Sequence, residues 1–219
     1  MLEALKKANP NLPLYAVTDA AFAPYGRVLA GETAALLDAL RKTEIPAEGN
    51  CYVASDGALE AVDAIHAWRH AVYGDMPVQA GFCNGSGDRL NAMEYHKSSE
   101  VNFSDTGLVL LLALPEEMAD GRLDSAAVRG FYLPPDVAIE VYPRVGHFAP
   151  CRVSEDGFQC LVVLERGVNS PIDVPGPGAD GEDKLLWMRG KWMTCHAESP
   201  QAEKGAFIGI TGENWDLEI

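Results

Sequence analysis

The sequence has few basic residues and no long apolar run. Its 219 residues include 17 lysines and arginines against 32 aspartates and glutamates, which gives a formal net charge of -15. A chain of this charge repels the phosphates of nucleic acids and the surface of an anionic membrane, so neither is an expected partner. The longest apolar run, LVLLLALP at residues 108–115, is too short to span a bilayer.

Cysteines are also few, and none forms a Cys-x-x-Cys pair. The five are scattered along the chain: Cys51, Cys83, Cys151, Cys160 and Cys195. An odd number at irregular spacing is typical of reduced thiols that pack as small hydrophobic side chains. The opening residues, MLEALKKANP, lack the apolar stretch of a secretion signal. We therefore expect a cytoplasmic protein.

Two segments of the first third have the apolar spacing of helices. These are residues 32–41 (ETAALLDALR) and residues 54–73, where apolar residues recur every three or four positions. From residue 76 onward, short β-rich runs alternate with Gly, Pro, Asp and Asn, as in sandwiches and barrels. The stretch 171–183 (PIDVPGPGADGED) has the composition of an exposed loop. We predict one domain over residues 1–219, mainly β, with an α/β cap over 1–75 and a barrel over 76–219.

A polar pattern in residues 91–103 (NAMEYHKSSEVNF) indicates a site. In a strand, every second side chain points to the same face. Here that face carries Glu94, His96, Ser98 and Glu100. If it is buried, a cation must compensate its charge. On an exposed helix, in contrast, His96 and Glu100 are only an ordinary surface pair.

A complete metal site needs another ligand from a different strand. His147 is the candidate, because it follows the alternating run VAIEVYP at residues 137–143 and can reach inward from a loop. Imidazole and carboxylate groups together suit zinc, manganese, iron, nickel or cobalt. We therefore predict one divalent metal ion held by Glu94, His96, Glu100 and His147.

Other polar residues are candidates for catalysis or substrate binding. Glu140 shares a strand face with Tyr142 and is a possible base if burial raises its pKa; otherwise it is an exposed strand carboxylate. His196 ends the run KWMTCH and is a further ligand, a substrate contact or a satisfied core histidine. The candidate catalytic residues are Glu140, Tyr142 and His196, and the candidate substrate-binding residues are Gln79, Asn84 and Lys191, of which Lys191 also suits a surface position.

The pattern Glu94-x-His96-x-x-x-Glu100, followed by His147, resembles the two metal-binding motifs of the cupins. The first cupin motif usually begins His-x-His, and Glu94 stands where its first histidine is expected. The Pro-x-Gly of the second motif is replaced by Pro134-Pro135-Asp136. The resemblance implies an RmlC-like cupin, that is, a double-stranded β-helix or jelly-roll barrel with a helical N-terminal cap. It also implies a homodimer, since cupins often pair through barrel strands.

Two resemblances within the cupins are more specific. The segments VTDAAFAPYGRVLAG (residues 17–31), MEYHKSSEVNF, GHFAPC and FQCLVVLERG resemble ureidoglycolate lyase. The blocks PVQAGFCNG, LNAMEYHKSSEVN, GHFAPC, EDKLL and KWMTCH are similar to an uncharacterised bacterial cupin family related to that lyase, from about residue 50 to the end.

The resemblance implies a metal-dependent enzyme acting on a small hydroxylated metabolite, as in the cleavage of ureidoglycolate to glyoxylate and urea. An aldose–ketose isomerase of carbohydrate metabolism is the second possibility, and a cupin that only binds a sugar or metabolite is the third. An acidic ligand set is expected to accept a neutral polyol more readily than a highly charged anion.

Overall fold

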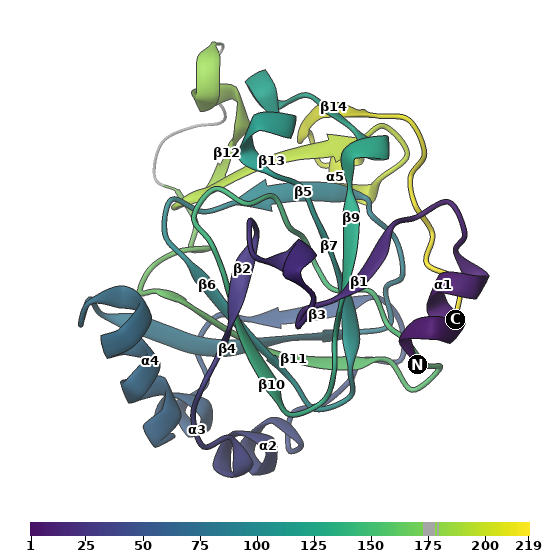
Figure 1. Cartoon of the computed structure of the whole chain (residues 1–219). Coiled ribbons are helices and arrows are strands. Elements are labelled where there is room, and N and C mark those ends of the chain that lie inside the picture. Colours follow the sequence, from purple (N-terminus) through teal and green to yellow (C-terminus); the bar gives the residue numbers. More distant parts are fainter. Residues whose placement is uncertain (173–177, 179) are drawn as a thin grey trace.

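The computed structural model gathers most of the strands around one interior and places the helices at its periphery (Figure 1). It describes residues 1–172, 178 and 180–219. Residues 173–177 and 179, which belong to the predicted loop at 171–183, lie outside the described residues. Over the part of the chain that is described, no helix is long and apolar enough to cross a membrane.

The largest sheet has six strands, in the order β2-β10-β6-β11-β4-β3, and every neighbouring pair is antiparallel. At its centre, Val162 of β11 lies opposite Asn102 of β6 and opposite Gly81 of β4. The strands are β2 (Gly26–Leu29), β3 (Asn50–Val53), β4 (Val78–Gly85), β6 (Glu100–Ser104), β10 (Val137–Val141) and β11 (Phe158–Glu165).

A three-stranded sheet, ordered β1-β9-β7, packs against this larger sheet. Its strands are β1 (Leu14–Ala16), β7 (Leu108–Leu112) and β9 (Arg129–Leu133). Along β7, Leu108 and Leu110 join an interior cluster that also contains Val162, whereas Val109 packs in a different cluster on the outer face. This alternation shows that the two sheets face each other across one apolar interior.

A further sheet carries the segment with the polar pattern. Its order is β12-β13-β14-β8, and β5 pairs antiparallel with β13. The strands are β5 (Ala92–Tyr95), β8 (Leu123–Asp124), β12 (Leu186–Met188), β13 (Lys191–His196) and β14 (Phe207–Thr211). An isolated bridge between Glu94 and His147 ties β5 to the loop between β10 and β11.

Three helices cover the outer face of the six-stranded sheet. Val101 and Phe103 of β6 point outward and pack in one cluster with Leu36 and Trp68 of these helices. The α3 helix begins after Asp56, whose carboxylate accepts hydrogen bonds from the first backbone N–H groups. The three covering helices are α2 (Ala34–Leu40), α3 (Gly57–Glu60) and α4 (Asp63–Tyr73). Two further helices, α1 (Leu2–Ala8) and α5 (Pro200–Glu203), lie elsewhere. Single-turn 3₁₀ helices occupy Ala20–Phe22, Pro115–Glu117, Ala119–Gly121, Ser125–Ala127 and Gly181–Leu185.

The predicted mainly β fold with a helical cap is confirmed, and the facing sheets agree with the barrel expected of a cupin. One detail differs from the sequence prediction. Residues 91–103 form two strands, β5 and β6, which turn at 96–99 because they join different sheets. The first 75 residues, predicted as an α/β cap, contain helices and also β1, β2 and β3, which hydrogen-bond within the sheets.

Candidate metal centre

Four polar side chains from three parts of the chain meet at one place. Glu94 lies on β5, His96 directly follows that strand and Glu100 begins β6. His147 comes from the loop after β10, and reciprocal backbone hydrogen bonds of 2.7 and 2.9 Å hold it against Glu94. All four side chains are buried. The fold therefore brings the predicted ligand set together.

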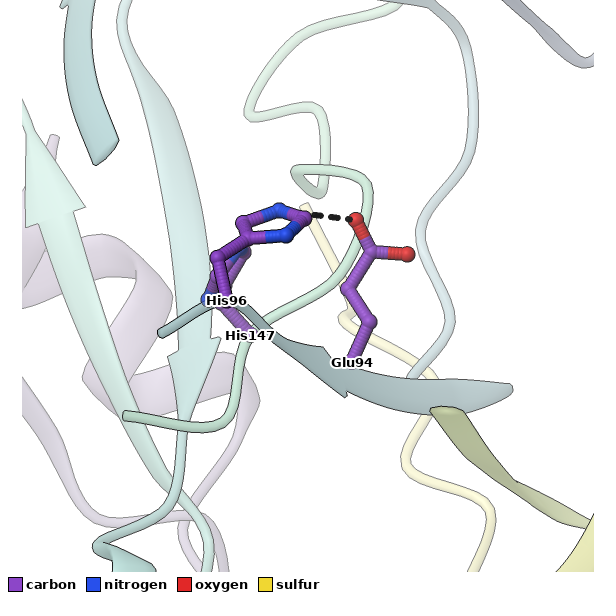
Figure 2. Close-up of side chains that lie close together, drawn as sticks. All are labelled: Glu94, His96 and His147. Carbon is purple, nitrogen blue, oxygen red and sulfur yellow. Dashed lines mark ion pairs between the residues drawn. The ribbon is translucent and has the colours of Figure 1, made fainter. Parts of the chain in front are cut away.

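The atoms that could ligate a cation converge (Figure 2). Nε2 of His147 lies 3.3 Å from Oε2 of Glu100, and Nε2 of His96 lies 3.4 Å from the same oxygen. Nε2 of His96 is also 3.9 Å from Oε1 of Glu94. Ligand atoms of Glu94, His96 and His147 all lie within 4.8 Å of one another. Glu100 is a fourth candidate, since its carboxylate oxygen lies beside both imidazoles.

Each imidazole is held by the nitrogen that faces away from the centre. Nδ1 of His96 donates to the carbonyl of Gly190 at 2.8 Å, and Nδ1 of His147 donates to the carbonyl of Val145 at 2.9 Å. Because a carbonyl oxygen only accepts, Nδ1 carries a proton in both residues, and Nε2 is the nitrogen that can act as a ligand. Both Nε2 atoms are buried and make no hydrogen bond. Buried polar atoms are rarely left in this state without a reason.

Both carboxylates are held in the same manner. Oε1 of Glu100 accepts a hydrogen bond of 2.8 Å from Nδ2 of Asn102, and Oε2 faces the two imidazoles. Oε2 of Glu94 forms an ion pair with Nζ of Lys191, while Oε1 faces His96. Two imidazoles and two carboxylates, each fixed from behind, match the donor set and the outer support of a divalent metal site.

Charge within the centre shifts two pKa values strongly. Burial opposes the charged form of Glu100, but the neighbouring His147 and His96 outweigh it and hold the Glu100 pKa well below its usual range. Burial likewise lowers the His147 pKa, but Glu100 and Glu94 outweigh it and raise that pKa to about 9. Without a metal, His147 and Glu100 are therefore an ion pair at neutral pH, and a metal ion would take the place of the imidazole proton.

A cavity of ≈ 320 Å³ opens beside the centre. Glu94, Glu100 and His147 form part of its wall, and Asn102 and Lys191 lie next to them. Apolar wall residues include Leu110, Phe148, Pro150, Val162 and Met188. This volume suits a small metabolite in contact with the converging ligand atoms.

Of the predicted substrate-binding residues, the structure places Lys191 in the cavity. Gln79 is instead tied to the loop after β11, donating to Val168 and accepting from the Gly167 N–H. Asn84 donates to Thr43 and to the Glu44 carbonyl, and accepts from the Cys160 N–H. The amide groups of Gln79 and Asn84 are thus occupied by contacts within the protein.

None of the three predicted catalytic residues is among those that line the cavity. Glu140 points to the opposite face of β10 from Ile139 and Val141, and accepts from Ser99 at 2.7 Å and Arg27 at 2.6 Å. Tyr142 follows β10 and packs at the edge of the interior cluster. Nε2 of His196 lies 3.2 Å from the Gly212 carbonyl, and its Nδ1 accepts from the Glu198 N–H.

Sequence reasoning did not identify four amide side chains on the cavity wall: Asn50, Asn102, Asn169 and Gln201. For Asn102 the signal was present, since it follows Glu100 by two positions and therefore shares its strand face. Asn169 and Gln201 lie outside the strands, in a loop and in α5, where no periodicity points to a site. Only the tertiary structure brings them to the cavity.

Comparison with solved structures finds remote likenesses to oxalate decarboxylase. One such structure is 12% identical, with a TM-score of 0.35, over 57% of this chain and 28% of that chain. A Bacillus subtilis oxalate decarboxylase described with Mn(II) centres is 10% identical, with a TM-score of 0.32, over 42% of this chain and 22% of that one. This chain thus spans less than a third of these proteins. A likeness so remote assigns neither a metal nor a substrate.

Comparison with known families and curated proteins gives one match. No curated protein matches the chain, and neither comparison links it to ureidoglycolate lyase. Residues 14–215, which include all four converging side chains, match the family described as a domain of unknown function, DUF4867. The chain therefore belongs to the DUF4867 family.

Proposed function

We propose that this protein is a metal-dependent enzyme acting on a small hydroxylated metabolite. One observation carries the proposal: Nε2 of His96 and Nε2 of His147 are buried, make no hydrogen bond and face carboxylate oxygens of Glu94 and Glu100. Such a donor set would hold one divalent ion, with zinc, manganese, iron, nickel and cobalt all compatible. When bound, the ion would act as a Lewis acid toward a hydroxyl and a neighbouring carbonyl or carboxylate oxygen.

The charge of the centre favours a substrate with a single negative charge. Lys191 offsets the Glu94 carboxylate, and both imidazoles are neutral as ligands. With a divalent ion, the two carboxylates and the ammonium leave one net positive charge in a buried space. This refines the expectation from the sequence, which considered the acidic ligands without Lys191 and favoured a neutral polyol. A 2-hydroxy acid balances the charge and also offers two neighbouring oxygens.

Elimination from such an acid, as in ureidoglycolate cleavage, is the reaction that we favour. The hydroxyl proton must leave, the carbon–nitrogen bond must break, and the departing nitrogen must gain a proton, which yields glyoxylate and urea. Glu94 and Lys191 form an ion pair on the cavity wall. In our proposal, Oε2 of Glu94 accepts the hydroxyl proton and Nζ of Lys191 donates to the nitrogen.

Two alternatives use the same cavity. An aldose–ketose isomerase would use the Glu94–Lys191 pair to move a proton between adjacent carbons of a free sugar. A binding protein would hold a sugar or metabolite without changing it. The homodimer and the cytoplasmic location expected from the sequence stay predictions.

Elemental analysis of protein purified without chelators tests the metal centre. We expect about one equivalent of a divalent metal in the wild type, and loss of that metal in His96→Ala and in His147→Ala. His70→Ala is the matched control, because His70 is exposed on α4 and pairs with its neighbour Asp75. Full metal content in His96→Ala would contradict the proposed ligand set.

Substrate assays then separate the three functions. Metal-loaded protein is incubated with ureidoglycolate, with release of glyoxylate and urea measured, and separately with a panel of pentoses and ketohexoses. Formation of glyoxylate above the uncatalysed rate supports the lyase, and interconversion of sugars supports the isomerase instead. A ligand that binds and is recovered unchanged supports the binding protein.

A further inference from the structure

Unpartnered amide oxygens gather on the wall of the cavity. Among the described residues, seven buried side-chain atoms lack a hydrogen-bond partner, and three of them are the amide oxygens of Asn102, Asn169 and Gln201. All three residues line the cavity that also exposes Glu94 and His147. Burying an amide oxygen without a partner destabilises the fold, and a ligand in the cavity could supply the missing donors.

The orientation of the Asn102 amide follows from its other contact. Nδ2 of Asn102 donates to Oε1 of Glu100 at 2.8 Å, and since a carboxylate only accepts, Oδ1 must be the free atom. In Asn169, Nδ2 lies 3.1 Å from the hydroxyl of Tyr52, and Oδ1 has no hydrogen-bond partner. The structure thus places the Oδ1 atoms of both amides as free acceptors toward the cavity.

The three amides come from separate elements. Asn102 is on β6 and adjoins the metal ligands through Glu100, Asn169 is in the loop after β11, and Gln201 is on α5. Asn169 also takes the positive φ of 63°, a backbone conformation that asparagine tolerates better than most residues. Three separate parts of the chain thus bring amides with free carbonyl oxygens to one cavity.

We infer that Asn102, Asn169 and Gln201 form an acceptor wall that recognises the tail of the substrate. This deepens the proposed function and rests on it: one end of the ligand contacts the metal centre, and the other carries hydrogen-bond donors. The donors are either hydroxyl groups, as in a polyhydroxy acid, or amide N–H groups, as in a ureido acid. An apolar tail is rejected, because it would leave the three buried oxygens unpartnered.

A series of 2-hydroxy acids tests the wall, with binding to metal-loaded protein measured by calorimetry. Lactate has an apolar tail, glycerate and erythronate add one and two hydroxyl groups, and tartronamate carries an amide N–H₂. We expect glycerate or tartronamate to bind about tenfold more tightly than lactate, because one additional hydrogen bond typically raises affinity by about that factor. A gain with erythronate identifies the hydroxyl source, and a gain confined to tartronamate identifies the amide source. Equal affinity for lactate, glycerate, erythronate and tartronamate would overturn the inference.

Variants of Gln201 provide a matched pair, because this residue lies on α5, away from the four metal ligands in the sequence. Gln201→Met keeps the length and removes the acceptor, so the preference over lactate should shrink to near one. Gln201→Glu keeps an acceptor oxygen and should retain the preference. Metal content, measured alongside, should equal that of the wild type in both variants. An unchanged preference in Gln201→Met would count against the wall.

The two proposals fail differently in these experiments. If lactate binds to the metal-loaded protein and the donor-bearing tails add nothing, only the acceptor wall is wrong. If the wild type takes up no metal and binds none of the acids, the proposed function and the wall both fall.

Discussion

Nε2 of His147 lies 3.3 Å from Oε2 of Glu100, buried between strands that are far apart in the sequence. The contact joins a loop residue to the first residue of β6. Each side chain is held from behind, by the Val145 carbonyl and by the Asn102 amide. The pair therefore has a fixed geometry before any ligand binds, which is the arrangement that a metal site requires.

Metal affinity should depend on pH because of this pair. The His147 pKa is raised to about 9 by Glu100 and Glu94 despite burial, so the metal-free imidazole carries a proton at neutral pH. A metal must displace that proton, and the apparent association constant should rise about tenfold per pH unit until about pH 9. Metal titrations at pH 6.5, 7.5 and 8.5 in a non-coordinating buffer measure the slope. An affinity that stays constant over this range would contradict the assignment of His147 as a ligand.

The unfolding free energy of the metal-free protein should fall as pH rises above 6.5, whereas metal affinity rises. A histidine whose folded pKa lies above its unfolded value of 6.5 stabilises the fold fully below that pH, and the contribution is lost as pH rises through about 9. Glu100, whose folded pKa is lowered, stabilises above its unfolded value of 4.5 and less as the solution becomes more acidic. Urea unfolding of chelator-treated protein should show this pair contributing most between pH 4.5 and 6.5. His147→Ala should flatten the decline between pH 6.5 and 9.

Replacing Asn102 should weaken metal binding although Asn102 is not a ligand. In Asn102→Leu, Oε1 of Glu100 loses the hydrogen bond that orients the carboxylate. Loss of such outer contacts typically lowers metal affinity 10- to 100-fold. Competition with a chelator of known affinity measures the change. Asn214→Ala is the control, since Asn214 hydrogen-bonds to Asn91, and it should bind metal as the wild type does.

Removing Lys191 should make the protein depend on its metal for stability. In Lys191→Met, the buried Glu94 carboxylate loses its ion-pair partner, and breaking such a pair costs about 3–5 kcal/mol. A bound divalent ion would restore the compensation, so the metal-induced rise in Tm should be larger in the variant than in the wild type.

Thermal unfolding with and without added metal checks this prediction for Lys191. Lys97→Met is the matched control, because Lys97 is half exposed and its pair with Glu182 should contribute at most about 1 kcal/mol. A metal-free Lys191→Met protein as stable as the wild type would show that the Glu94 charge needs no partner.

Replacing Glu140 should lower the unfolding free energy and leave metal binding unchanged. Its carboxylate accepts from Ser99 and Arg27 on the face of β10 opposite the interior, so Glu140→Gln should lose about 1–2 kcal/mol of unfolding free energy. Metal content and ligand affinity should stay as in the wild type. Denaturant unfolding and elemental analysis measure both, with the exposed Glu3→Gln as control. Lost ligand binding at unchanged stability would instead support a contact between Glu140 and the ligand.

The sequence determined the local character of this protein. The continuous apolar run at 108–112 indicates a strand that is buried on both faces, and the spacing in 32–41 indicates a helix with one apolar side. Residues 91–103 also carried the chemistry of the site, because imidazole and carboxylate at alternate positions are unusual in a strand unless something compensates them. These are short-range properties, readable over a few residues.

The tertiary structure decided what those properties serve. The pairing of β5 with β13 and the bridge to His147 turn the Glu94 side chain toward the centre. Glu140 lies on the face of β10 that points away from the interior, where it accepts a hydrogen bond from Ser99. Asn169 and Gln201 reach the cavity from segments whose local pattern does not indicate a site. Alternation along a strand says which residues share a face, but not what lies opposite. That depends on contacts between residues far apart in the sequence, such as Arg27 and Glu140 at a separation of 113 positions, which no local periodicity encodes.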